Sequence, residues 1–166
     1  MTCTTRRLAE ADAVEYLALR REALEREPFA FGSSPDDDRL RSVELVREML
    51  LDADQAVIGA FASDLIGTVG VGRMNRRKVR HKAQLWGVYV RREHREAGVG
   101  RQLIEAAIRY ARDQQGVELL HLTVSERAVA AAALYESLGF TTWGIEASGL
   151  RVDGVDLAER HMVLVL

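Results

Sequence analysis

A strand, a turn with two glycines and an amphipathic helix follow one another between residues 84 and 112, and this succession constrains the fold more than any other feature of the chain. The run QLWGVYV, residues 84–90, has the β-branched and aromatic composition of a strand. From Gly98 to about Gln115 the pattern becomes that of a helix with one buried face. The side chains on that face are Val99, Leu103, Ile104, Ala107, Ile108 and Ala111.

The start of this helix has the properties of a phosphate-binding site. The first backbone N–H groups of a helix have no intrahelical partner, and the helix dipole adds partial positive charge there. Gly98 and Gly100 leave room for a phosphate to approach, and Arg95 and Arg101 can add charge-assisted hydrogen bonds. The alternative is that the glycines only make a tight connection between strand and helix. The spacing and the flanking arginines favour the phosphate site.

Two common nucleotide-binding motifs do not fit this turn. A dinucleotide-binding G-x-G-x-x-G needs a third glycine where Leu103 stands. A P-loop needs Gly-Lys-Ser/Thr, a triplet that the sequence lacks, so a nucleotide-dependent switch of that type is excluded.

Hydrophobic periodicity and turn residues predict the other elements. A strand is expected at 4–8, a helix at about 12–27 with Val14, Leu17, Ala18 and Leu24 on its buried face, and a second helix from Ser42. Further strands are expected at 56–62, 65–74, 119–124, 141–147 and 160–166, and a helix at 128–138. The order β-α-α-β-β-β-α-β-α-β-β predicts a mixed sheet with helices packed on it.

Composition limits the class of protein. A chain of 166 residues has the length of one domain, and a net charge of −2 argues against a partner that is a nucleic acid. The longest apolar runs, 56–62 and 128–135, are far shorter than the ~20 residues that span a bilayer, and the start MTCTTRRLAEADAVEY lacks the apolar segment of a signal peptide. Cys3 is the one cysteine, which fits a reducing compartment. We therefore expect a cytoplasmic protein that does not bind a membrane.

Two segments resemble the signatures of the GNAT superfamily of N-acetyltransferases. REAGVG, residues 95–100, is similar to its R/Q-x-x-G-x-G/A turn, and AAALYESLGF, residues 131–140, is similar to its A-x-x-L-Y-x-x-x-G-F signature. The resemblance implies one acetyltransferase domain over residues 1–166. Its fold would be α/β (α+β), with a twisted, mostly antiparallel central sheet of six or seven strands and about four helices.

The resemblance also implies an activity. The acetyl group of acetyl-coenzyme A would pass to a primary amine of a small molecule or peptide by direct attack in a ternary complex, with no metal ion. A different class of function is a non-catalytic acyl-CoA-binding or regulatory module of the same fold. A homodimer is the oligomer expected on general grounds, because closed twofold pairs dominate.

The family's functional residues map onto two parts of this chain. The backbone of Val88, Tyr89 and Val90 would pair with the pantetheine arm, and a backbone N–H there would polarise the thioester carbonyl. The pyrophosphate would lie on Arg95, Glu96, Ala97, Gly98, Val99, Gly100 and Arg101. Tyr135 would protonate the departing thiolate as general acid. The alternative for Tyr135 is a core residue with no chemical role.

The sequence departs from the family pattern at two positions. Ala128 replaces an asparagine that often contacts the cofactor arm, and Gln84 replaces a glutamate that serves as base in some members. A base is needed, because an aliphatic amine with a pKa near 10 is protonated at pH 7. The other candidates, none favoured by spacing, are Glu22, Glu146, His121 and His161.

The acceptor is expected between residues 29–39 and 148–159. Asp36, Asp37 and Asp38 could attract a cationic amine, with Phe29 and Phe31 as an apolar wall. The alternative is that the acidic run is solvated and the aromatic residues anchor the loop. Trp86 and Trp143 are interpreted as packing residues.

Overall fold

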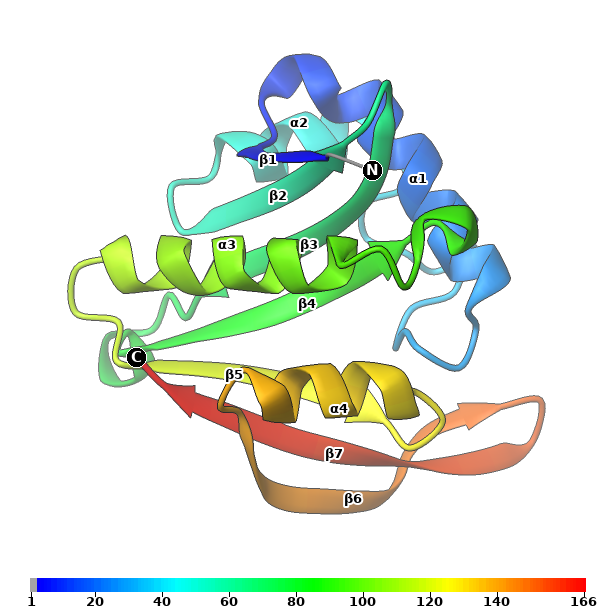
Figure 1. Cartoon of the computed structure of the whole chain (residues 1–166), viewed down its shortest axis with the longest axis vertical. Helices are drawn as coiled ribbons and strands as arrows, with labels where there is room; N and C mark the ends of the chain where they lie inside the picture. Colours follow the sequence, from blue (N-terminus) through cyan, green and yellow to red (C-terminus); the bar gives the residue numbers. More distant parts are fainter. Residues whose placement is uncertain (1–2) are drawn as a thin grey trace.

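The computed structural model describes residues 3–166, and its helices and strands follow the predicted order (Figure 1). The strands are β1 (Thr4–Arg7), β2 (Gln55–Phe61), β3 (Leu65–Arg73), β4 (Lys82–Val90), β5 (Leu119–Ser125), β6 (Thr141–Val152) and β7 (Val155–Val165). The helices are α1 (Ala13–Arg26), α2 (Val43–Leu51), α3 (Val99–Asp113) and α4 (Val129–Ser137). Within residues 3–166, no helix combines the length and the apolar character needed to cross a lipid bilayer.

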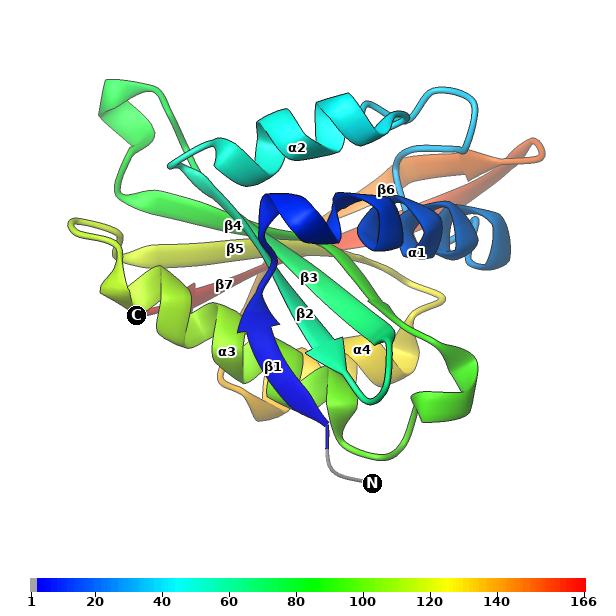
Figure 2. The ribbon, with the colours of Figure 1, turned by 90° about the horizontal axis from the view of Figure 1, so that it is seen from above.

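One sheet holds all the strands of the described chain, in the order β1-β2-β3-β4-β5-β7-β6. Neighbouring strands are antiparallel except for β4 and β5, which are parallel. Helices α1 and α2 cover one face of the sheet, and α3 and α4 cover the other (Figure 2). The predicted fold, a mostly antiparallel sheet of six or seven strands with about four helices, is therefore confirmed.

Each face of the sheet has its own hydrophobic core. The core under α3 contains all six predicted apolar side chains of that helix, and the core under α1 and α2 contains Leu17, Val46 and Leu50. The predicted buried face of α1 is wrong at Val14, which is 62% exposed, and at Ala18, which is also exposed. Larger side chains of α1, including Tyr16 and Leu19, occupy the inward positions instead.

The closing hairpin is longer than predicted. The turn lies at Asp153 and Gly154, as expected, and both have positive φ, +49° and +78°. A two-residue loop of this conformation is typical of a tight hairpin. Strand β6 continues to Val152 and β7 begins at Val155, so the predicted strand ends near 147 and 160 are wrong. An irregularity of register between Glu146 and Leu150 interrupts the alternation that would have revealed the longer strands.

Strands β4 and β5 begin side by side and then diverge, as Figure 1 shows. They pair only at Lys82–Leu119, Ala83–Leu120 and Gln84–His121. A β-bulge follows in β4, where Gly87 has φ +60° and the register with β3 shifts. A bulge bends its strand and increases its twist, so we attribute the divergence of β4 from β5 to it.

Gly70 of β3 lies directly under the indole of Trp86, its partner on β4, and the indole occupies the position that a Cβ atom at Gly70 would take. We expect Gly70→Ala to push the indole aside and lower the free energy of unfolding by about 1–3 kcal/mol. Gly144→Ala is the matched control, because a Cβ at this strand glycine meets no atom within 4 Å. Chemical denaturation measures both, and equal stability of the two variants would contradict this packing.

Candidate active site

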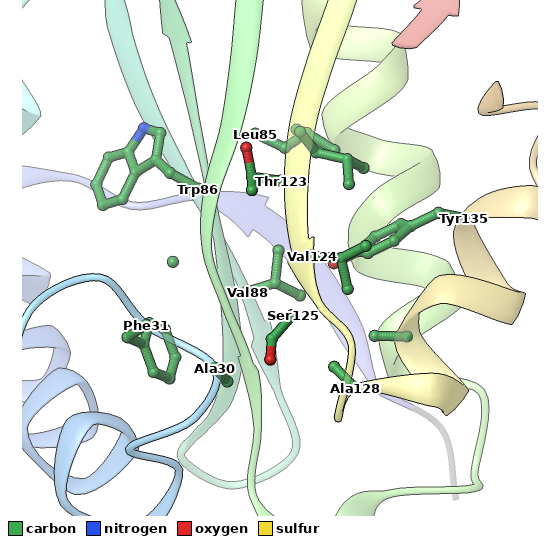
Figure 3. Close-up of a pocket in the computed structure, with 13 residues that line it drawn as sticks. Ala30, Phe31, Leu85, Trp86, Val88, Thr123, Val124, Ser125, Ala128 and Tyr135 are labelled. Carbon is green, nitrogen blue, oxygen red and sulfur yellow. The ribbon is translucent and has the colours of Figure 1, made fainter. Parts of the chain in front are cut away.

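A cleft of about 110 Å³ lies where β4 and β5 separate. Residues 85–88 of β4 and 122–125 of β5 form its sides. Figure 3 shows Phe31 and Trp86 on the side of the sheet that α1 covers, and Tyr135 reaching in from α4 on the other side. The cleft is therefore lined by side chains from both faces of the sheet.

Side chains along β5 alternate between these two faces. Leu122 and Val124 are buried in the same core as Tyr135. Because successive side chains of a strand point to opposite faces, Thr123 and Ser125 lie on the α1 side. Apolar groups of β5 therefore face α4, and its polar groups face the region under the α1–α2 loop.

The turn before α3 presents free backbone amides. None of the N–H groups of residues 98–101 donates to a backbone carbonyl within residues 3–166, and the first such bond of the helix runs from Gln102 N to Gly98 O, 3.1 Å. Gly98 is the N-cap with φ +79°, and a Cβ there would meet no atom within 4 Å. The turn is thus open at Gly98, and its free amides lie at the positive end of the helix dipole.

The two arginines of the turn make contacts within the protein. Arg95 donates from Nε to the carbonyl of Val90, 2.8 Å, and from Nη2 to Glu27 Oε1, 2.7 Å. Arg101 donates from Nη2 to Ser137 Oγ, 2.7 Å, which joins α3 to α4. In this structure Arg95 therefore fixes the turn to the end of β4 and to α1. Glu96 and Ala97 are exposed at the tip of the turn, and Glu96 has φ +63°.

The predicted backbone contacts come from the free edge of β4. No residue of β4 beyond Gln84 pairs with β5, so its backbone groups on that edge are open to another extended chain. The side chains of Val88 and Val90 pack on the core under α3. The side chain of Tyr89 points to the opposite face, where its hydroxyl donates to Glu22 Oε1, 2.9 Å.

Tyr135 belongs to the core under α3 and also lines the cleft. Its ring is 5% exposed and packs edge-on against Phe140, with 5.8 Å between centroids. Burial raises the pKa of Tyr135 to about 12, so its hydroxyl keeps its proton at neutral pH. Ala128 lines the same cleft and offers no polar side chain there. The structure thus places a protonated phenol on the α4 side of the opening.

The candidate bases differ in their surroundings. Glu22 is held by Arg91, with Nε 3.2 Å from Oε2, as well as by Tyr89. His121 pairs in register with Gln84, and burial is the main cause that lowers its pKa. His161 and Glu146 contact each other, with 3.2 Å between Nε2 and Oε2. These two are the candidates that the fold brings together.

The acidic run of the α1–α2 loop is mostly structural. Asp38 is buried and accepts two hydrogen bonds of 2.6 Å from Arg20. Asp37 accepts from the backbone N–H of Ser34, 2.6 Å, which lowers the pKa of Asp37. Asp36 alone is exposed without such a contact within residues 3–166. The alternative of a solvated acidic run is therefore wrong at Asp38, which is buried. Its other part fits at Phe31, which packs on the core under α1 and α2.

Two cleft residues have roles that the sequence did not indicate. Trp86, interpreted as a packing residue, packs on Gly70 and also forms part of the cleft wall. Thr123 lies in the cleft although nothing in its neighbourhood in the sequence distinguishes it from an exposed strand residue. Its position depends on where β4 and β5 part, which follows from pairing across the sheet and not from local sequence.

The comparison with protein families matches most of the chain. The profile described as Acetyltransferase (GNAT) family matches residues 16–140. N-acetyltransferase 8B of Homo sapiens is 33% identical over 100 residues, which cover 60% of this chain and 44% of that protein. The chain spans less than half the length of the curated relatives it matches.

Solved structures share the fold over nearly the whole chain. An acetyltransferase of the GNAT family from Streptococcus pneumoniae superimposes with a TM-score of 0.87 and 24% identity, covering 99% of this chain and 100% of that one. YncA from Salmonella typhimurium, solved with its cofactor acetyl-CoA, gives a TM-score of 0.82 and 23% identity, covering 99% and 94%. At this identity the likeness shows a common fold.

The raised pKa values of three tyrosines make the stability of the protein depend on pH. Burial raises the pKa of Tyr16, Tyr89 and Tyr135 from 10 to about 12. A raised pKa means that folding favours the protonated phenol, so this contribution is complete below pH 10 and is lost as pH rises through 12. We expect the free energy of unfolding to fall across this interval, and to fall less steeply in Tyr135→Phe. Denaturation at fixed ionic strength measures it, and a flat profile in both proteins would contradict the assignment.

Proposed function

The chain belongs to the acetyltransferase (GNAT) family, and we propose that it transfers the acetyl group of acetyl-coenzyme A to a primary amine of a small molecule or peptide. One observation carries the proposal: the cleft between β4 and β5 is lined by side chains from both faces of the sheet. An amine can thus enter from the α1 side while the acyl donor occupies the α3 and α4 side. Direct attack in a ternary complex needs access from both sides.

The residues present fit the acyl donor. The free amides of residues 98–101 lie at a helix start that is open at Gly98, which suits a diphosphate. The unpaired edge of β4 can hydrogen-bond an extended amide-containing arm as a neighbouring strand would. When bound, acetyl-coenzyme A would supply the activated acyl group.

The chain's own groups then have distinct tasks. Backbone N–H groups of residues 88–90 would hold and polarise the acyl carbonyl, because preorganised donors stabilise oxygen as it gains negative charge. Tyr135 Oη holds its proton at neutral pH and would donate it to the leaving sulfur. Phe31 and Trp86 would exclude water from the acceptor side of the cleft.

A non-catalytic acyl-CoA-binding module is the alternative, motivated by Ala128 and Gln84 at positions where family members often carry Asn and Glu. Such a module would bind the thioester without releasing thiol in the presence of any amine. Tyr135 in the cleft favours the enzyme.

The turn can be tested with a matched pair at Gly98. Asn and Asp both tolerate the left-handed conformation and have the same size, so Gly98→Asn and Gly98→Asp differ mainly in charge. We expect Gly98→Asp to bind acetyl-CoA about tenfold or more weakly than Gly98→Asn, because a carboxylate would repel the diphosphate. Calorimetry measures the two affinities. Equal affinities would mean that the diphosphate does not bind at this turn.

The chemistry can be tested at Tyr135. Thiol release is measured over polyamines, amino acids, peptides and aminoglycosides, and the wild-type protein is expected to turn over at least one class. Tyr135→Phe should lower kcat about 10²- to 10⁴-fold and leave acetyl-CoA affinity unchanged, because only the proton donor is removed. Unchanged kcat in Tyr135→Phe would mean that Tyr135 has only a structural role. Binding of acetyl-CoA by the wild-type protein without any turnover would favour the alternative module.

A further inference from the structure

Three polar side chains form a continuous hydrogen-bonded chain on the α1 side of the cleft. Thr123 of β5 and His161 of β7 are register partners, and Thr123 Oγ1 is 3.3 Å from His161 Nδ1. The other ring nitrogen of His161 is 3.2 Å from Glu146 Oε2 on β6. The chain therefore runs across three strands, from a residue that lines the cleft to a carboxylate at the sheet edge.

This arrangement fixes which nitrogen of His161 is free to accept a proton. The Glu146 carboxylate is an acceptor only, so Nε2 must carry the hydrogen in that contact. Nδ1 then carries the lone pair and accepts from the Thr123 hydroxyl. The indole of Trp143, 5.3 Å from the imidazole between centroids, packs against the ring and restricts its rotation.

A bulge in β6 places Trp143 in this position. The register with β7 shifts between Thr142 and Gly144, so Trp143 is the additional residue. Its indole also packs edge-on against His121, with centroids 6.3 Å apart. Trp143 thus separates the two imidazoles, and Thr123 and Glu146 make the hydrogen bonds of His161.

We propose that Thr123, His161 and Glu146 form a proton relay that deprotonates the acceptor's ammonium group; this rests on the proposed transfer to an amine. The N–H bond of the ammonium breaks as Thr123 Oγ1 gains that proton, and Thr123 passes its own hydroxyl proton to His161 Nδ1. The proton ends on the imidazole, and Glu146 stabilises the resulting imidazolium. Thr123 contacts the acceptor, whereas His161 and Glu146 act through it.

The surroundings suit a cationic amine. Among residues 3–166, Glu146 of β6 contacts His161, and Glu159 of β7 lies close enough to interact with it electrostatically. His121 of β5 contacts the same indole as His161. Burial and the neighbouring Glu146 raise the pKa of Glu159, while His161 lowers it. The relay can accept a proton only when the His161 imidazole is neutral.

A pair of acceptors that differ in basicity isolates the relay. Phenethylamine is protonated at neutral pH, whereas fluorination at its β carbon gives β,β-difluorophenethylamine, a much weaker base that needs little deprotonation. We expect His161→Gln and Thr123→Val to lower kcat/KM for phenethylamine about tenfold or more at neutral pH and to shift the rise of its rate with pH toward the pKa of the amine itself. Turnover of the difluoro amine should change less than threefold.

Matched variants separate the relay from general damage. Thr123→Ser keeps the hydroxyl and should retain the wild-type pH profile, and Glu159→Gln removes a nearby carboxylate that is outside the chain. Equal losses for both amines in His161→Gln, or a shifted pH profile in Glu159→Gln but not in His161→Gln, would overturn the relay.

A second readout does not depend on turnover. The ¹⁵N shifts of His161 in the free protein should report the Nε2–H tautomer, and Glu146→Gln should shift the population toward Nδ1–H. An Nδ1–H tautomer in the wild-type protein would overturn the relay whatever the activity. If the tautomer is as expected and no amine releases thiol, the proposed function fails, and the relay as a catalytic device fails with it. If amines turn over and the tautomer is wrong, the relay alone fails.

Discussion

Strands β4 and β5 hydrogen-bond at three residue pairs and then separate, although both lie in the middle of the sheet. Buried backbone groups normally find partners, so an unpaired edge at this place calls for a ligand or solvent. The bulge at Gly87 bends β4 just after the last pair, at Gln84 and His121. The cleft, the free edge of β4 and the lining of the cleft from both faces all follow from this interruption of the sheet.

The cleft divides the proposed chemistry between the two faces of the sheet. Tyr135 lies among apolar side chains on the α4 side, where burial keeps its phenol protonated. Thr123 and His161 lie on the opposite face, among polar and charged groups. A proton donor and a proton acceptor on opposite sides of one opening allow the amine to lose a proton while the leaving thiolate gains one. Alternation along β5 produces this separation.

The parts that the sequence predicts well are those set by local patterns. Helix α3 buries all its predicted side chains, since it has one strongly apolar stripe and a glycine at its start. Helix α1 has apolar residues on several sides, so its periodicity does not distinguish Val14, which is exposed, from Tyr16, which is buried. The role of Asp38 depends on a distant partner, Arg20, and the contact of His161 with Glu146 depends on the register of two strands. Neither contact can be inferred from local sequence patterns.

The most direct measurement is a crystal structure of the protein grown with acetyl-CoA. The expected complex has diphosphate oxygens within hydrogen-bonding distance of the backbone nitrogens of residues 98–101. Its pantetheine arm lies between β4 and β5, with the thioester near Tyr135 Oη. A ligand bound elsewhere on the surface, or a structure in which β4 and β5 close together and side chains fill the cleft, would contradict it.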